Sequence, residues 1–140
     1  MILYLDTSSL VKLYVEEDKS LDIEALVESA EFAATSIVAY AEARAAFARR
    51  FREKAFTPQE YNRIKKSFDK DWNSYLILSL TEDMIRLAGN LAEKHALRGF
   101  DSIHLSSALK LRRELSSPVT FSCFDDNLQK ASKREDLDQN

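Results

Sequence analysis

Short apolar segments alternate with helical patterns along this chain, and this alternation restricts the possible folds more than any other feature of the sequence. Four segments have the length and composition of strands: Ile2–Leu5, about Glu31–Thr35, Tyr75–Leu80 and Val119–Cys123. Six segments between them have helical patterns: about Ser8–Val15, Leu21–Ser29, Ile37–Lys54, Pro58–Trp72, Glu82–His95 and Ser102–Leu115. Apolar strands separated by helices indicate a parallel sheet covered on both faces. We therefore predict a three-layer α/β/α fold with a short parallel sheet of four to five strands.

Two of the predicted helices begin with capping signals. Thr57 precedes Pro58, and proline suits the first position of a helix because its missing N–H would have no partner there. Thr81 precedes two acidic residues, which are favourable in a first helical turn. Gly99 is expected to end one helix before the next begins. These signals support the helices predicted at Pro58–Trp72 and Glu82–His95.

The length of the chain fits one compact domain. A chain of 140 residues can bury a core without disulfides, and no linker or repeat divides it, so we predict a single domain over residues 1–140. No apolar run has the length of a signal peptide or a membrane span. The one cysteine, Cys123, excludes an internal disulfide. We therefore expect a cytoplasmic protein without membrane contact.

Several classes of catalytic site are excluded by what the sequence lacks. With only Gly89 and Gly99, neither a phosphate-binding P-loop nor a glycine-rich dinucleotide turn can form. The chain has no G-x-S-x-G motif, which argues against a serine hydrolase, and His95 and His104 are its only histidines. The groups that remain in quantity are carboxylates.

Charge is distributed unevenly along the chain, whose net charge is -3. Residues 1–31 contain eight acidic side chains and two lysines, whereas residues 44–66 contain eight basic side chains and two acids. A local basic surface can hold phosphate groups even on an acidic protein. The ordinary alternative is a set of solvated helix faces. The candidates for contacts to a phosphate-bearing substrate are Arg44, Arg49, Arg50, Lys65 and Lys66.

Four of the acidic residues follow predicted strands or open a predicted helix. Asp6 ends the first strand, Asp101 opens the Ser102–Leu115 helix, and Asp125 and Asp126 follow the last strand. Each could simply cap a helix by accepting a backbone N–H. In an open parallel sheet, however, ligands bind beyond the carboxyl ends of the strands. Asp6 and the Asp125–Asp126 pair are therefore candidates for a shared site at that edge.

Two acidic residues lie on helices next to apolar side chains. Asp101 shares a helix face with Leu105 and Ala108, so its carboxylate is expected to point inward. Glu42 lies in the middle of a helix, where capping is impossible. It is expected at the edge of an apolar stripe formed by Ile37, Val38, Ala41, Ala45 and Ala48. The alternative for Glu42 is a side chain that extends to water.

Convergence of these acids would require a cation. If Asp6, Glu42, Asp101 and Asp125 meet at one sheet edge, mutual repulsion raises the pKa of each carboxyl unless a cation binds. Their hard oxygen atoms select Mg²⁺ or Mn²⁺ over Zn²⁺. Such ions activate water for phosphodiester hydrolysis without a side-chain nucleophile or a histidine base. This chemistry fits a chain that is rich in carboxylates and lacks the motifs of other catalytic sites.

The sequence resembles the PIN-domain family, and is most similar to VapC-type ribonuclease toxins of toxin–antitoxin pairs. The motifs that carry the resemblance, in the order of the family, are LDTSSLVKLY, TSIVAYAEARAAF, GFDSIHLSSAL and TFSCFDDNL. The resemblance implies an Mg²⁺- or Mn²⁺-dependent endoribonuclease. It also matches positions of this chain to the acids of the family's catalytic metal site, which are Asp6, Glu42, Asp101 and Asp125, with Asp126 as the alternative to Asp125.

Further positions follow from the same resemblance. Thr7 and Ser8 match the hydroxyl positions after the first acid, where they would orient it or a metal-bound water. Cys123 departs from the family, which usually has threonine or serine there. His104 is expected to be packed or hydrogen-bonded and not to act as the catalytic base. The implied partners are an RNA substrate, a cognate antitoxin that crosses the acidic site, and a second copy of the chain in a homodimer.

Two other functions compete with this interpretation. A catalytically silent PIN-like module would bind RNA or a protein partner without cutting, although the presence of all four acids argues against it. A phosphatase or receiver domain also has an aspartate after its first strand. A phosphatase needs a second aspartate where Ser8 stands, and the lysine and paired acids of a receiver fit this sequence poorly.

Overall fold

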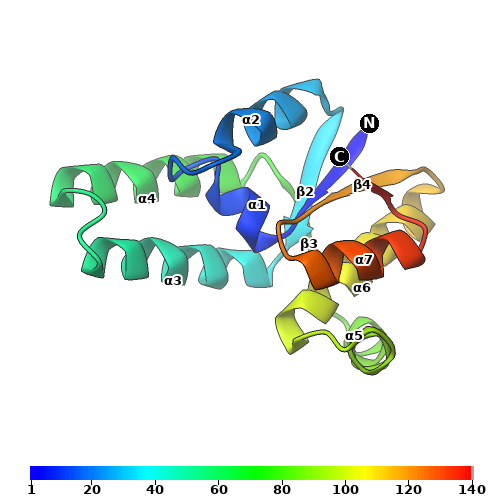
Figure 1. The fold of residues 1–140 in the computed structure, drawn as a ribbon. Coiled ribbons are helices and arrows are strands. Elements are labelled where there is room, and N and C mark those ends of the chain that lie inside the picture. Colours follow the sequence, from blue (N-terminus) through cyan, green and yellow to red (C-terminus); the bar gives the residue numbers. More distant parts are fainter. Residues whose placement is uncertain (140) are drawn as a thin grey trace.

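A five-stranded parallel sheet forms the centre of the protein, whose computed structural model describes residues 1–139 (Figure 1). The strands are β1 (Ile2–Leu5), β2 (Phe32–Ser36), β3 (Leu76–Leu78), β4 (Val119–Ser122) and β5 (Asp138–Gln139). Their spatial order is β3-β2-β1-β4-β5, and all four pairings are parallel. The predicted parallel sheet of four to five strands is therefore confirmed. The β5 strand was not predicted, because two residues carry no periodic signal.

Seven helices connect the strands within the described residues. They are α1 (Thr7–Val11), α2 (Ser20–Ser29), α3 (Val38–Arg52), α4 (Pro58–Trp72), α5 (Glu82–His95), α6 (Gly99–Leu115) and α7 (Asp126–Arg134). In Figure 1, α3 and α4 extend together to one side of the sheet as a long hairpin, whereas α5, α6 and α7 gather on the other side. None of the helices within residues 1–139 is long and apolar enough to cross a lipid bilayer.

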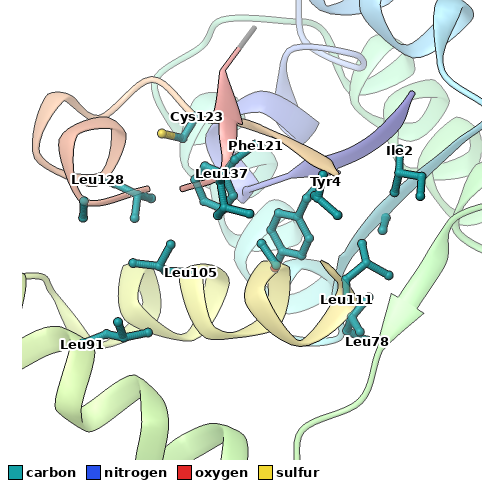
Figure 2. Close-up of a cluster of buried hydrophobic side chains, with 14 of the residues drawn as sticks. Ile2, Tyr4, Leu78, Leu91, Leu105, Leu111, Phe121, Cys123, Leu128 and Leu137 are labelled. Carbon is teal, nitrogen blue, oxygen red and sulfur yellow. The ribbon is translucent and has the colours of Figure 1, made fainter. Parts of the chain in front are cut away.

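Two separate hydrophobic clusters line the two faces of the sheet. In β1, Ile2 and Tyr4 join the cluster beneath α5, α6 and α7 (Figure 2). Leu3 and Leu5 join the cluster beneath α1 to α4. Successive side chains of a strand point to opposite faces, so a strand buried on both sides is apolar throughout. The uninterrupted apolar run of β1 is thus explained, and the predicted α/β/α layering is confirmed.

Local capping explains why α4 and α5 have the predicted bounds. The Thr57 hydroxyl accepts a hydrogen bond from the backbone N–H of Glu60 at 3.1 Å, and Glu60 Oε1 accepts one from the Thr57 N–H at 2.8 Å. This reciprocal pair, with Pro58 in the first helical position, fixes the start of α4. The Thr81 hydroxyl likewise accepts from the N–H of Met84 at the start of α5.

Other predicted boundaries were wrong. Gly99 does not end a helix, because α5 already ends at His95 and Gly99 is the first residue of α6. Ala96, the C-cap of α5, has a left-handed backbone with φ 54°. Asp101 therefore lies in the first turn of α6 and not before it. The first helix ends at Val11, four residues earlier than predicted, and the α7 helix after Asp125 was missed.

The predicted apolar stripe of α3 was also wrong. The buried face of this helix contains Ala39, Ala43 and Phe47, whereas Ile37 is 49% exposed and Ala41 is exposed. Alanines occur on every side of α3, so the apolar pattern alone does not select a face. The one bulky buried ring, Phe47, does so by packing edge-on against Phe68 of α4.

Candidate active site

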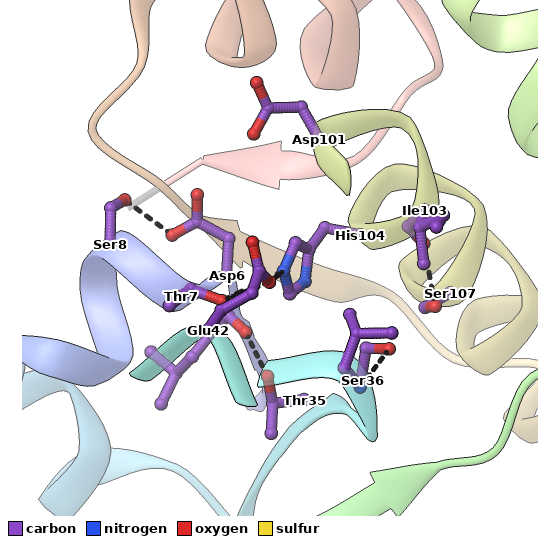
Figure 3. Close-up of polar contacts among 12 residues, drawn as sticks. Asp6, Thr7, Ser8, Thr35, Ser36, Glu42, Asp101, Ile103, His104 and Ser107 are labelled. Carbon is purple, nitrogen blue, oxygen red and sulfur yellow. Dashed lines mark hydrogen bonds and ion pairs between the residues drawn. The ribbon is translucent and has the colours of Figure 1, made fainter. Parts of the chain in front are cut away.

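The predicted acids gather beyond the carboxyl ends of the strands. Asp6 follows β1, Glu42 lies in the second turn of α3 after β2, Asp101 lies in the first turn of α6, and Asp125 follows β4. Figure 3 shows Asp6, Glu42 and Asp101 around the ring of His104. The topology therefore brings together residues from four distant segments, as expected for the crevice of an open parallel sheet.

Asp6 is both a helix cap and a buried charge. Its Oδ1 atom accepts hydrogen bonds from the Ser9 N–H at 3.0 Å and the Ser8 hydroxyl at 2.7 Å, and it is the N-cap of α1. Only 4% of Asp6 is exposed. Burial raises the pKa of Asp6, although the neighbouring His104 and the bond from Ser8 oppose this effect. Within residues 1–139, Oδ2 makes no hydrogen bond, so it is available to a ligand.

Glu42 is held by a hydroxyl and an imidazole. Its Oε1 atom accepts a hydrogen bond from the Thr7 hydroxyl at 2.7 Å and lies 2.8 Å from Nε2 of His104 (Figure 3). Partial burial raises the pKa of Glu42, but the bonds from His104 and Thr7 outweigh it and leave this pKa below its ordinary value. Glu42 is therefore an ionised ligand candidate in a fixed position, and its side chain is 27% exposed.

Glu42 and a buried tyrosine contact the two ring nitrogens of His104 and indicate which one carries the hydrogen. The Tyr4 hydroxyl lies 2.8 Å from Nδ1 of His104, which is 1% exposed. Since the Glu42 carboxylate can only accept, a neutral His104 donates from Nε2, and Nδ1 accepts the hydroxyl hydrogen of Tyr4. Desolvation raises the pKa of Tyr4, so this hydroxyl keeps its hydrogen. As predicted, His104 is packed and hydrogen-bonded, here as a support for Glu42.

Asp101 and Asp125 face the same arginine. Arg98 Nε donates to Oδ2 of Asp101 at 2.9 Å, and Arg98 Nη2 lies 3.7 Å from Oδ1 of Asp125. The Asp101 side chain is 17% exposed, in agreement with the inward direction predicted from its helix face. Its apolar neighbours Leu105 and Ala108 are fully buried.

The doublet Asp125–Asp126 is divided by the start of α7. Asp125 is the N-cap, and its Oδ2 accepts from the Leu128 N–H at 2.9 Å. Asp126 is exposed and borders a different hollow of about 400 Å³, together with Lys130 and Lys133. Of the two, Asp125 is the one that the fold places beside Asp101 through Arg98.

The hydroxyl and thiol neighbours differ in their roles. Thr7 bonds Glu42 and Ser8 bonds Asp6, so both hydroxyls contact predicted site acids. The Ser8 hydroxyl also accepts from the Phe124 N–H at 3.2 Å, which ties α1 to the segment after β4. Cys123 is buried, and burial raises the pKa of its thiol, so Cys123 stays uncharged beside the acids.

The residues present suit a hard divalent cation in donor type. Three buried or partly buried carboxylates and two hydroxyls are the oxygen donors that Mg²⁺ and Mn²⁺ prefer. Burial of Asp6 and the charge of Asp101 both raise the pKa of Asp6, and a bound cation would relieve this strain. Across residues 1–139, no three His, Cys, Asp or Glu side chains lie close enough together to hold a metal ion. Glu42 contacts His104, and Asp101 contacts Arg98.

The predicted RNA-contact residues lie on the α3–α4 hairpin. Arg50 pairs with Glu17 at 2.6 Å, Arg49 lies 3.6 Å from Glu53, and Arg44 Nη1 donates to the Tyr40 hydroxyl at 2.9 Å. On α4, the Lys65 ammonium lies 4.2 Å from the centre of the Tyr61 ring, and Lys66 is exposed. None of these five cations pairs with Asp6, Glu42, Asp101 or Asp125 in the described part of the chain. Their contact with RNA stays a prediction.

Residues 3–133 match the family described as PIN domain. This chain belongs to the PIN domain family. Among curated relatives, Ribonuclease VapC45 of Mycobacterium tuberculosis is 37% identical to this PIN domain over 108 residues, which cover 77% of this chain and 75% of the relative. Ribonuclease VapC47 of the same organism is 32% identical over 124 residues, covering 86% and 84%. The predicted VapC-type resemblance is thus confirmed.

Solved structures share the fold of this PIN domain at low sequence identity. FitAcB from Neisseria gonorrhoeae has a TM-score of 0.70 at 17% identity, covering 99% of this chain and 96% of that chain. VapBC2 from Rickettsia felis, bound to a DNA fragment from its promoter, has a TM-score of 0.66 at 16% identity, covering 100% and 98%. These likenesses extend over the whole PIN domain and establish its architecture.

Two residues of the site were missed by sequence reasoning. Tyr4 lies in an apolar strand, where a buried hydroxyl needs a partner, so its presence there was a usable signal. Arg98 precedes Asp101 by three residues, a spacing that permits contact on a helix. Its approach to Asp125 depends on the packing of the PIN domain, and no local pattern predicts it.

Proposed function

We propose that this PIN domain is an endoribonuclease that depends on Mg²⁺ or Mn²⁺ and acts as the toxin of a toxin–antitoxin pair. The observation that carries this proposal is the convergence of Asp6, Glu42 and Asp101 at one sheet edge. The described residues at this edge offer no activated serine, and Cys123 keeps its hydrogen. Metal-assisted hydrolysis is the chemistry that this set of residues supports.

Each acid has a distinct part in the proposed site. Asp6 offers its free Oδ2, Asp101 offers Oδ1 and Glu42 offers Oε2. Asp125 offers Oδ1, which lies 3.7 Å from Arg98, because its Oδ2 caps α7. Thr7 and Ser8 hold two of these carboxylates in place. When bound, Mg²⁺ or Mn²⁺ would make a water molecule more acidic and neutralise charge on the phosphate.

The substrate and the protein partner are inferred from the relatives. Two curated relatives are named ribonucleases, which supports RNA as the substrate. Several structural neighbours are complexes named VapBC or FitAB, and one is titled a toxin–antitoxin complex, which supports an antitoxin as the partner. A homodimer and a cytoplasmic location stay predictions.

A silent PIN-like module that only binds RNA or a partner is the second candidate. The lowered pKa of Glu42 disfavours it, because a supporting network of Thr7 and His104 keeps this carboxylate charged. A module that only binds RNA would not benefit from a charged carboxylate held in this way, because the charge repels phosphate groups.

Cleavage of RNA by the purified protein tests the proposal. Total cellular RNA is incubated with the protein and Mg²⁺, Mn²⁺ or EDTA, and the new 5′ ends are sequenced. We expect discrete cuts with either metal and none in EDTA. Asp125→Asn should lose most of this activity, whereas Asp126→Asn should keep it. Metal-independent cutting, or no cutting by the wild-type protein with either ion, would contradict the proposed function.

A further inference from the structure

Arg98 contacts two of the acids of the candidate site. It is the residue immediately before α6, it has an extended backbone, and its side chain makes no capping bond. Its Nε donates to Asp101 at 2.9 Å, and its Nη2 lies 3.7 Å from Asp125. One guanidinium group therefore spans carboxylates from two separate elements of the fold.

Arg98 is the one lysine or arginine in residues 1–139 that pairs with any of the four site acids. Lys12 is close in sequence to Asp6, but its ammonium pairs with Glu17 at 3.0 Å and lies over the Phe124 ring. Hydrogen bonding to Asp101 raises the pKa of Arg98, and the charges of Asp125 and Glu42 add to this effect. Two of the site acids thus hold a permanent cation beside them.

Most of the Arg98 guanidinium is free to bind something else. A guanidinium has five N–H donors in one plane, and the contacts to Asp101 and Asp125 involve only Nε and Nη2. The side chain is 79% exposed, so the remaining donors face solvent. Such a planar set of donors matches the paired oxygens of a phosphate group.

A cation beside these acids favours the approach of a phosphodiester. The carboxylates of Asp6, Glu42, Asp101 and Asp125 repel a phosphate that approaches them. On the α3–α4 hairpin, Arg50 and Arg49 already pair with Glu17 and Glu53. Within residues 1–139, no basic side chain of the hairpin forms an ion pair with the four site acids. Arg98 is placed to attract the phosphate at the point where the acids would otherwise exclude it.

We propose, on the basis of the ribonuclease function above, that Arg98 is a catalytic residue that binds the scissile RNA phosphate through its free N–H groups. Asp101 and Asp125 hold its Nε–Nη2 edge, which leaves the opposite edge for the nonbridging oxygens of the phosphate. Arg98 thereby adds a substrate contact to the site without being a metal ligand.

Four proteins test this role: the wild type, Arg98→Ala, Arg98→Lys and the matched control Arg86→Ala. Arg86 is also an exposed arginine, at 75%, whose Nε pairs with an acid on its own helix, Glu82 of α5. RNA affinity is measured with a fluorescein-labelled single-stranded RNA of mixed sequence in EDTA. Mn²⁺ affinity is measured without RNA by calorimetry, and cleavage of total RNA is measured with Mn²⁺.

We expect Arg98→Ala to lower RNA affinity about tenfold and kcat/KM for cleavage at least about tenfold, as for other lost charged hydrogen bonds. Arg98→Lys should recover part of both losses, because lysine restores the positive charge but not the planar set of N–H donors of the guanidinium. Mn²⁺ affinity of Arg98→Ala should equal or exceed that of the wild type, since a competing cation is gone. Arg86→Ala should match the wild type in all three measurements.

Unchanged RNA affinity and cleavage in Arg98→Ala would overturn the phosphate-binding role. Weaker Mn²⁺ binding in Arg98→Ala would also overturn it, because Arg98 would then act by fixing the position of Asp101. If the wild type cuts no RNA, the ribonuclease proposal fails, and the binding measurement still decides whether Arg98 contacts a phosphate backbone.

Discussion

His104 Nε2 lies 2.8 Å from Oε1 of Glu42, although 62 residues separate them in the chain. The same imidazole meets the Tyr4 hydroxyl through Nδ1. This chain of contacts connects the buried first strand to a carboxylate at the sheet edge. The site acid Glu42 is therefore positioned from within the core, through Tyr4 and His104.

Removal of the Tyr4 hydroxyl tests this arrangement. Tyr4→Phe preserves the ring that stacks on Phe121 but leaves Nδ1 of His104 buried without its donor. We expect the free energy of unfolding to fall by about 1–2 kcal/mol, the usual result of leaving a buried acceptor unpaired. Urea denaturation in EDTA measures the loss, and ¹⁵N NMR of the imidazole reports a change of tautomer.

Tyr61→Phe is the control for this experiment. The Tyr61 ring stacks on Phe51, and within residues 1–139 its hydroxyl makes no hydrogen bond. Its replacement should change the unfolding free energy by less than about 0.5 kcal/mol. Equal stability losses in the two variants would show that the Tyr4–His104 contact contributes nothing specific.

Asp101→Asn should abolish metal-dependent cleavage while the PIN domain stays folded. The amide cannot supply the anionic ligand, and we expect a loss of at least about a hundredfold in kcat. From sequence alone, the loss of one repelling charge would be expected to stabilise the protein in EDTA. The ion pair with Arg98 offsets that repulsion, so we expect little change in melting temperature.

Asp83→Asn is the matched variant for Asp101→Asn, because Asp83 is also an acid in the first turn of a helix. Its cleavage rate should equal that of the wild type. Both rates are measured with Mg²⁺ and with Mn²⁺. A cleavage-competent Asp101→Asn protein would remove Asp101 from the site.

The fold was predictable wherever the determining signals are local. Thr57, Pro58 and Glu60 lie within four residues of one another, and their capping bonds form as soon as α4 does. The face of α3 was not predictable in this way. Its many alanines fit either side, and the choice depends on Phe68 from a different helix.

The candidate site shows the same division between local and tertiary information. Asp6 and Asp101 could be found from the sequence because they lie beside apolar residues at a strand end or a helix start. Burial of a carboxylate there is costly unless it binds a partner or a cation. The Tyr4–His104 contact spans 100 residues of sequence, and the Arg98–Asp125 contact depends on how α6 lies beside the end of β4. Neither contact can be predicted from a periodic pattern in the sequence.

The buried carboxyl of Asp6 should make the metal-free protein sensitive to pH. The folded-state pKa of Asp6 lies above the unfolded value of about 3.9. The folded state therefore binds more protons in the window between these values, and stability falls as pH rises through the folded pKa. Asp6→Asn keeps a side-chain oxygen for Ser8 and Ser9 but removes the charge.

In EDTA, the melting temperature of Asp6→Asn should exceed that of the wild type by about 2–5 °C at neutral pH, with the gap closing as pH approaches 4. Calorimetry across this pH range measures the gap. Addition of Mn²⁺ should raise the melting temperature of the wild type more than that of the variant. A difference in melting temperature that does not vary with pH would mean that the charge of Asp6 does not destabilise the folded protein.

Glu135 should show the opposite dependence on pH. Its carboxylate accepts from Lys94 at 2.7 Å and lies 2.7 Å from Nε2 of the buried His95, which connects the end of α5 to the end of α7. The bond from Lys94, followed by that from His95, lowers the pKa of Glu135. Its contribution to stability is thus complete above the unfolded pKa of about 4.3 and is lost as pH falls through the lower folded pKa.

Glu135→Gln should therefore lower the free energy of unfolding by about 1–2 kcal/mol at pH 7, mostly through the buried His95, because Lys94 is 63% exposed and its ion pair is screened. The difference from the wild type should shrink below about pH 4. Glu93→Gln, on the exposed side of α5, should leave stability unchanged at every pH. Urea denaturation from pH 3 to 7 measures all three proteins, and RNA cleavage should be equal in all of them at pH 7. A Glu135→Gln deficit that persists undiminished in acid would mean that packing, and not the carboxylate charge, holds α5 to α7.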